Sequence, residues 1–433
     1  MFSLFNLFKN TSIVTLSTVI SRLAGYVREI LLAAWMGTSA ATDALIVATR
    51  IPTLLRKIST EGALNGALLP LIQDLEKKHH QRTIHNLINK IILIFSAFFV
   101  VFFIFESHFS KNILSILAPG ILESTERLYW FEKFIPFTSL TVLLFFLFAI
   151  FSALLNHNNK FFWPAIAPTF WNLTLIILIF FAQYYNYDYS ILGPIFLIAP
   201  LIQLIVVIIP YLKLNIPFRI VKDHESKGIL KQFFKSFLPV MFSASITQIN
   251  SVILIAFSSF LPSGNTTILH RSERLLQVPI GIMIALSTTL LPELTHHKEH
   301  HKKIIRSSIA LCAGVFIPIS IIFFFFNLPL VKLIFNYGKC ENSDILKIAE
   351  MLKIYSFGIP AFLLVRILPI CFFAMKDVKV TTNGATLHTI LNIGSTIFLM
   401  KKYQLLGFAY ASLISSWAHV LFLLFFLIKR KYV

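Results

Sequence analysis

The chain of 433 residues is 57% hydrophobic and only 13% charged, and it contains 45 phenylalanines. Soluble domains carry about a quarter charged residues, so this composition excludes an ordinary soluble protein and predicts a polytopic membrane protein. The net charge of +19 does not indicate nucleic-acid binding, because the basic residues gather in the connections between apolar runs.

Apolar runs of about 20 residues or more, long enough to cross a bilayer as helices, recur along the whole chain. We expect transmembrane helices near residues 11–36, 43–72, 86–108, 131–156, 161–184, 190–212, 233–261, 266–293, 304–335, 346–375, 379–400 and 404–428. The sequence therefore predicts an all-α fold with twelve transmembrane helices.

Basic residues alternate between rich and poor connections, which predicts the orientation of the chain in the membrane. The rich segments include Lys77 and Lys78, the stretch from Lys213 to Lys235, and the last residues around Lys429. The positive-inside rule then puts both termini of a multi-pass membrane protein in the cytoplasm.

The longest basic connection divides the chain into two halves. Its apolar residues Ile229, Phe233, Phe234 and Phe237 have helical spacing, which indicates an amphipathic helix on the inner leaflet. We expect a six-helix N-terminal lobe at 1–212, a cytoplasmic linker at 213–232 and a six-helix C-terminal lobe at 233–433.

A weak internal sequence repeat relates the two predicted lobes. The sequence LLP ends at Pro70 in the second run and at Pro292 in the eighth. Two halves with an even number of spans have the same orientation, so this predicts a parallel pseudo-repeat.

Ionisable residues inside the first, second and eighth runs predict a cationic cavity between the lobes. By residue count, Arg28, Arg50 and Arg274 lie roughly 10 to 12 Å below the outer surface, with Arg22 and Arg56 about 20 Å below it. A bend at Gly25 would turn both Arg22 and Arg28 inward. Charges at such depth mark function, and arginine forks suit phosphate or pyrophosphate. The predicted substrate-binding residues are Arg22, Arg28, Asp43, Arg50, Arg56 and Arg274.

Other polar residues support narrower expectations. Glu61 and Arg366 fall at similar depth and are a predicted gate, while Arg28 with Glu29 and Lys57 with Glu61 could equally be local pairs. The histidine tract His296–His301 lies in a basic loop and, like three scattered cysteines, predicts no metal site. No cofactor is expected.

Several stretches resemble the MurJ (MviN) family of lipid II flippases: SRLAGYVREILLA, ATDALIVATRIPTLLRKISTEGALNGALLPLI, HRSERLLQVPIGIM, FNYGK and KDVKV. The family belongs to the superfamily of multidrug and polysaccharide exporters. The resemblance implies alternating access that moves an undecaprenyl-pyrophosphate-linked disaccharide pentapeptide to the outer leaflet for peptidoglycan synthesis. It matches Arg22, Arg28, Arg56 and Arg274 to the basic cavity positions and Asp43 to the acidic one.

The chain departs from the family pattern in two respects. The family usually has fourteen spans, against twelve expected here, and its acidic position after the span-eight arginine corresponds to Gln277, beside a retained Glu273. The seventh and eleventh spans lack Asp and Glu, so the sequence does not support a sodium site built from carboxylates there. An inside-negative membrane potential is a possible energy source for transport.

The function predicted is a flippase for lipid II, not an enzyme, with possible contacts to the cell-wall synthesis machinery. The alternatives are a flippase for another polyprenyl-pyrophosphate-linked oligosaccharide and a membrane glycosyltransferase that uses such a lipid. A glycosyltransferase would need acidic residues in a sizeable outer loop, and Glu123, Glu126 and Asp344 form no such constellation.

Overall fold

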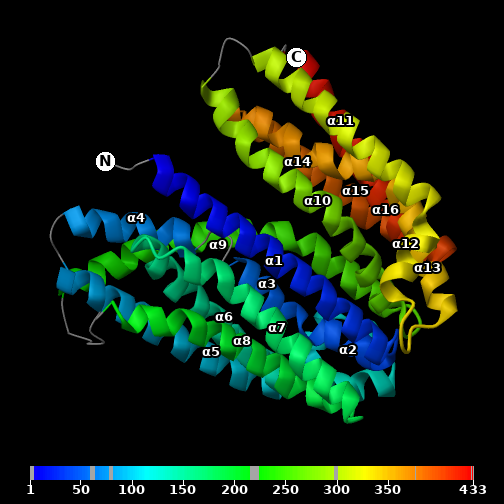
Figure 1. The fold of residues 1–433 in the computed structure, drawn as a ribbon, viewed down its shortest axis with the longest axis horizontal. Coiled ribbons are helices and arrows are strands. Elements are labelled where there is room, and N and C mark those ends of the chain that lie inside the picture. The colour runs from blue at the N-terminus through cyan, green and yellow to red at the C-terminus, as the bar shows by residue number, and fades with distance from the viewer. Residues whose placement is uncertain are drawn as a thin grey trace. The chain divides into compact units, whose positions relative to one another are not determined.

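The computed structural model describes residues 4–58, 64–77, 81–214, 224–296, 301–375, 377–430 and 432. These residues form α-helices joined by turns and two short 3-10 segments, and none of them lies in a β-strand. The predicted all-α fold class is confirmed. The helices group into two compact units, Met1–Ile249 and Asn250–Val433, whose elements are labelled in Figure 1.

The first unit packs around one central helix. Its elements are α1 (Leu4–Met36), α2 (Ala40–Ala48), α3 (Arg50–Ile58), α4 (Leu64–Lys77), α5 (Gln81–Leu117), η2 (Pro119–Ile121), α6 (Thr125–His157), α7 (Phe162–Tyr184), η3 (Tyr189–Ile191), α8 (Leu192–Leu212) and the start of α9 (His224–Ser259). Helix α6 contacts α2, α3, α4, α5, α7 and α8, while α1 packs along α7. The site described below lies where α1 and α3 approach α6 and α7.

The second predicted span, residues 43–72, is wrong as a single helix, because the structure divides it into α2, α3 and α4. Pro52 explains the first break. A proline ring clashes with the carbonyl four residues earlier, here that of Ala48, and α2 ends at Ala48. Directly after α2, the Thr49 hydroxyl donates to the carbonyls of Leu45 and Ile46 at 2.7 and 3.2 Å. The site residues predicted in this span are therefore divided between two helices, with Asp43 on α2 and Arg50 and Arg56 on α3.

The second unit contains a tight helical hairpin. Its elements are the end of α9, α10 (Asn265–His296), α11 (His301–Phe325), α12 (Asn327–Phe335), α13 (Asn342–Ser356), α14 (Ile359–Ala374), α15 (Val378–Tyr403) and α16 (Leu405–Lys429). Helices α15 and α16 pack along each other, and α14 contacts α10, α11 and α16. The predicted span 346–375 is bent by 49° between α13 and α14.

The expected amphipathic helix around Phe233 is present, but it is the first part of α9, which runs without a break to Ser259. Phe233 and Phe237 are buried in the core of the first unit, where Phe95 stacks on Phe146 at 4.0 Å between ring centroids. The ring of Phe95 also lies 5.5 Å from that of Phe237. These contacts hold the start of α9 against α5 and α6, so this segment is a packed part of the first unit.

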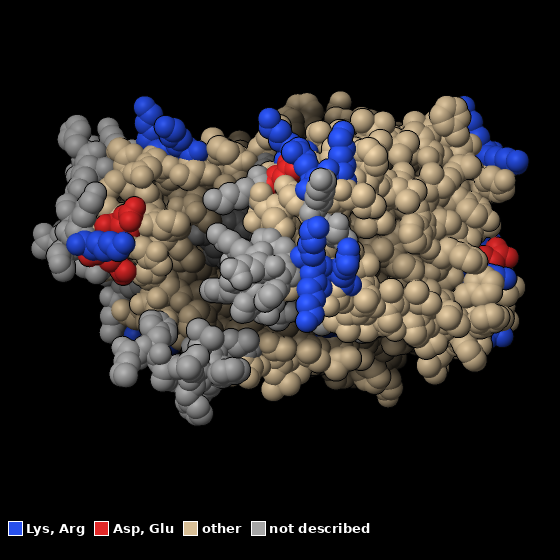
Figure 2. All heavy atoms as spheres, turned by 90° about the horizontal axis from the view of Figure 1, so that it is seen from above, with Lys and Arg blue, Asp and Glu red and all other residues tan. Residues whose placement is uncertain are grey.

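Among the described residues, six helices are long and apolar enough to cross a membrane, or seven if α13 and α14 count as one bent span. Figure 2 shows a face on which Lys and Arg gather in separate groups, while most of the surface carries no charged side chain. Large exposed apolar residues such as Leu16, Ile104 and Phe398 agree with a lipid-facing surface. The protein is therefore a multi-pass membrane protein.

Candidate functional site

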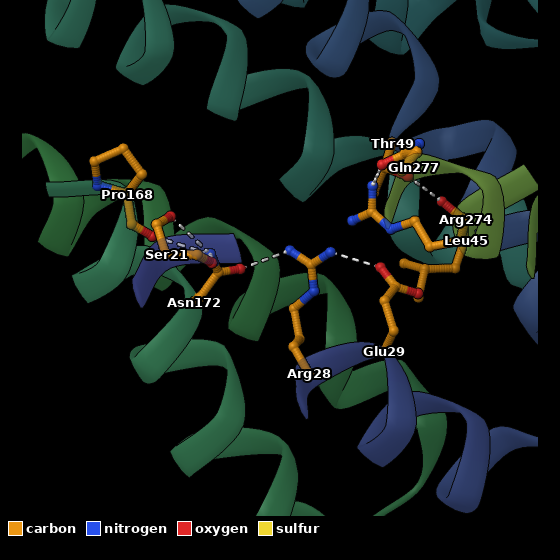
Figure 3. A network of polar contacts seen from close by, with 9 residues as sticks. All are labelled: Ser21, Arg28, Glu29, Leu45, Thr49, Pro168, Asn172, Arg274 and Gln277. Atoms are coloured by element: carbon orange, nitrogen blue, oxygen red, sulfur yellow. Dashed lines mark hydrogen bonds and ion pairs between the residues drawn. The ribbon is translucent and has the colours of Figure 1, made fainter. Parts of the chain in front are cut away.

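Arg28 is the buried centre of the polar network in the first unit. Its side chain lies on α1 with 6% of its surface exposed, and its Nη1 donates to Asn172 Oδ1 at 3.0 Å. Its Nη2 donates to Glu29 Oε1, so the guanidinium lies between an amide and a carboxylate (Figure 3). A buried arginine needs such partners, because an isolated charge at membrane depth costs several kcal/mol.

Trp171 brings a second arginine to the same place. The guanidinium carbon of Arg28 lies 5.1 Å from the centroid of the Trp171 ring, and that of Arg56 lies 5.4 Å from it. Arg56 also lies 5.7 Å from the ring of Phe145 on α6. Cation–π contacts of this kind stabilise a partly desolvated guanidinium by about 1 to 2 kcal/mol. Two positive charges from α1 and α3 thus share one indole of α7.

Asn172 fixes the position of α7 relative to α1. Its side-chain amide donates to the backbone carbonyls of Ser21 at 3.0 Å and Pro168 at 3.1 Å, while its oxygen accepts from Arg28. Neither Trp171 nor Asn172 is among the site residues predicted from the sequence, which were chosen by their charge. The detectable signal was an asparagine in an apolar run next to a tryptophan.

The other predicted residues of the first unit lie in different environments. Asp43 is fully buried in the first turn of α2, where the helix dipole favours a carboxylate. Arg50 begins α3 and is half-buried. Arg22 is exposed, and α1 runs as one helix through Gly25. The structure therefore brings Arg28 and Arg56 together on Trp171, and Arg22 does not join them in this unit.

In the second unit, Arg274 lies on α10 and its Nη1 donates to Gln277 Oε1 at 2.9 Å. Gln277, at the position where the resemblance implies an acidic residue, is thus a direct partner of the predicted arginine. Arg366 is on α14, but Glu61 lies outside the described residues, so the gate stays a prediction. Part of the histidine tract also lies outside them, and no group of three or more His, Cys, Asp or Glu side chains in the described chain could hold a metal.

The chemistry available to the first unit is anion binding. Guanidinium groups bind phosphate oxygens through paired hydrogen bonds, and an aromatic platform orients their planes. Arg28 and Arg56 come from different helices, so an anion held by both would connect α1 with α3. The indole contributes without adding a negative charge that would compete with that anion.

Comparison with known families identifies the chain. The family model described as "Lipid II flippase MurJ" matches residues 32–433. The chain belongs to the MurJ family. A probable lipid II flippase MurJ from Buchnera aphidicola subsp. Acyrthosiphon pisum is 32% identical over 436 residues, covering 99% of this chain and 85% of that protein. A probable lipid II flippase MurJ from Aquifex aeolicus is 29% identical over 95% of this chain and 81% of that one.

Solved structures show the same fold. A lipid II flippase MurJ in an inward closed conformation superposes with a TM-score of 0.84 at 26% identity, covering 96% of this chain and 87% of that one. An inward-facing multidrug resistance MATE transporter has a TM-score of 0.77 at 11% identity, with 94% of each chain covered. The MurJ family thus shares its fold with multidrug transporters, and its members are transporters rather than enzymes.

Proposed function

We propose that this protein is a flippase that moves lipid II from the inner to the outer leaflet of the bacterial inner membrane, in support of cell-wall synthesis. One observation carries the proposal beyond family membership: Arg28 and Arg56 come from two different helices, α1 and α3, and share the indole of Trp171. Lipid II presents a pyrophosphate between its polyprenyl tail and its sugar, and that group is the natural ligand of paired arginines.

The break between α2 and α3 supports a moving site. Helix α1 carries Arg28 and α3 carries Arg56, and between them lie the turn after Met36, helix α2 and its end at Ala48. A pyrophosphate bound by both arginines stabilises one arrangement of these helices, and its release allows another. Binding energy spent in this way shifts the population of conformations, which is what alternating access requires.

The wider architecture belongs to the same proposal. Twelve transmembrane helices form two six-helix lobes, 1–212 and 233–433, related by a parallel pseudo-repeat and joined by the 213–232 linker, with both termini in the cytoplasm. The lobes enclose a central cationic cavity. Its substrate-binding residues are Arg28, Asp43, Arg50, Arg56 and Arg274, and Glu61 with Arg366 form its gate. Cell-wall synthesis enzymes that use lipid II are the expected partners on the outer face.

The experiment is a translocation assay with the purified full-length chain in vesicles. Labelled lipid II is placed in one leaflet, and its appearance in the other is measured by an added enzyme or quencher that cannot cross. We expect protein-dependent movement of lipid II that exceeds movement of a teichoic-acid or O-antigen precursor. Equal transport of all three would favour a general polyprenyl-pyrophosphate flippase, and no transport of lipid II would refute the proposal.

A further inference from the structure

The interface between α15 and α16 contains a polar seam that the anion site does not use. On α15 the residues Gly384, His388, Asn392 and Thr396 follow one another at intervals of four, which places them on one face of the helix. Asn392 Nδ2 donates to Ser415 Oγ at 3.2 Å, and the Thr396 hydroxyl donates to the Asn392 carbonyl at 2.7 Å.

Two histidines face each other across this seam. The ring centroids of His388 and His419 are 5.7 Å apart, and His388 Nε2 lies 3.3 Å from Ser416 Oγ. His388 precedes the end of α15 by about 22 Å of helix and His419 follows the start of α16 by about 21 Å, so both lie at one level of the hairpin. That level is near the middle of each helix.

His419 is the unusual member of the pair. Its side chain is 4% exposed, and within the described part of the chain neither of its ring nitrogens has a hydrogen-bond partner. Its Nε2 lies against the α15 backbone, since a Cβ added to Gly384 would approach it to 2.7 Å. A buried polar group without a partner costs about 1 to 3 kcal/mol, so its presence in the hairpin calls for an explanation.

His388 is the ionisable neighbour that acts on His419, and a positive charge on one imidazole disfavours a positive charge on the other. The helices packed against the hairpin, α10, α13 and α14, carry the titratable and charged groups His270, Arg271, Glu273, Arg274, Asp344, Lys347, Glu350, Lys353, Tyr355, Arg366 and Cys371. None of these makes a described hydrogen bond or ion pair with either imidazole.

We propose that His388 and His419 form a site that binds one proton, and that its loading couples a proton gradient to lipid translocation. The coupling role rests on the proposed flippase function, whereas proton binding stands on the geometry of the hairpin. A hydronium ion gives its proton to the lone pair of one ring nitrogen and leaves as water, which produces an imidazolium, and the Ser416 oxygen, 3.3 Å from His388 Nε2, can accept from an N–H there. A second proton is disfavoured because two positive charges would lie side by side in a buried interface.

Loading the site changes how well α15 packs on α16. With the pair neutral, the hairpin buries His419 against Gly384. A positive charge in the same place requires water or a new acceptor, so protonation favours an arrangement in which the helices open. If the packing of α15 on α16 responds to protonation in this way, one step of the transport cycle depends on pH.

Direct proton counting tests the binding site without transport. The purified protein is titrated between pH 8 and pH 4, and the double variant H388Q/H419Q is compared with the wild type. We expect the double variant to take up about one proton fewer, as for a coupled pair that shares a proton. A difference of two protons would mean independent histidines, and no difference would mean inert ones; either result overturns the proposal. The matched control is H108Q, which changes an exposed histidine on α5 away from the hairpin.

Vesicles with an imposed pH gradient, and with the voltage clamped, test the coupling. The lipid II translocation rate of the wild type should change severalfold, up to about tenfold for one pH unit if one proton moves per cycle. The dependence of the rate on the pH gradient should disappear in H388Q/H419Q. If the double variant does not fold, the single variant H388Q is used, because His388 is only half-buried. Lipid II movement that ignores the gradient refutes the coupling alone. No lipid II movement in the wild type refutes the flippase function, and the proton count still decides on the site.

Discussion

Trp171 offers a sharp test of how the arginines are held. Replacing it with leucine keeps an apolar side chain on α7 but removes the aromatic face that contacts both Arg28 and Arg56. The Asn172 hydrogen bond to Arg28 stays in place. The change therefore disturbs the orientation of two cations without removing a charge.

The size of the effect follows from burial. A cation–π contact is worth about 2 kcal/mol when desolvated and about 0.5 to 1 kcal/mol when exposed. Arg28 is 6% exposed and takes the larger value, while the half-buried Arg56 takes the smaller. Together they amount to about 3 kcal/mol, which corresponds to an upper limit of about 100-fold in binding. We expect the half-saturating lipid II concentration to rise by about 10- to 100-fold.

The assay is lipid II translocation in vesicles as a function of lipid II concentration. The control is Trp163→Leu, since Trp163 lies on the same helix, is 39% exposed and contacts the neighbouring Phe162 ring. Trp171→Phe, which keeps a weaker aromatic face, should fall between W171L and the wild type. If W171L lowers thermal stability but leaves the half-saturating concentration unchanged, Trp171 is a packing residue and the reasoning is refuted.

Three further changes test the fold, the orientation and the gate. Gly407→Ala should lower the melting temperature in detergent, because a Cβ there would lie 2.6 Å from the α15 backbone, whereas Gly394→Ala on α15 has open space and should be neutral. Equal melting temperatures would contradict this packing. Cys340 should react with an impermeant maleimide added outside intact cells, slowly at neutral pH and faster as pH rises, because burial raises the pKa of its thiol; labelling only after lysis would reverse the orientation. Single charge reversals at Glu61 and Arg366 should impair complementation of a flippase-depleted bacterium, and the double reversal should restore it; no rescue would exclude the gate.

Hydropathy predicted the all-helical, multi-pass character of the chain because a membrane span is recorded locally, in about 20 consecutive residues. Six or seven of the described helices meet that requirement, and the twelve spans stay a prediction. The breaks were harder. Pro52 was visible in the sequence, yet only the structure shows that α2 ends at Ala48 and that a second helix carries Arg56. The bend between α13 and α14 was likewise hidden in an apolar run. Continuous hydrophobicity tells how much chain is apolar, and it does not tell whether the helix is continuous.

The charged residues of the site could be predicted from the sequence, but the residues that hold them in position could not. Arginines in apolar runs are conspicuous, so Arg28 and Arg56 could be chosen from sequence. Trp171 and Asn172 were marked only as an asparagine next to a tryptophan in an apolar run, and their contacts could not be predicted because the face of α7 that meets α1 depends on tertiary packing. Arg22 shows that a conspicuous charge in the sequence need not belong to the site. It lies six residues from Arg28, which points it to another face of a straight helix, and α1 has no break at Gly25 that would turn it inward.

The central claim is that Arg28 and Arg56 recognise the pyrophosphate of the transported lipid. Its most direct test compares translocation of lipid II with that of a matched lipid carrying a single phosphate, by the wild type and by R28A/R56A. We expect the wild type to prefer the pyrophosphate lipid strongly and the double variant to transport both at similar low rates, because the lost contacts are those to the extra phosphate. An undiminished preference in R28A/R56A would contradict the account.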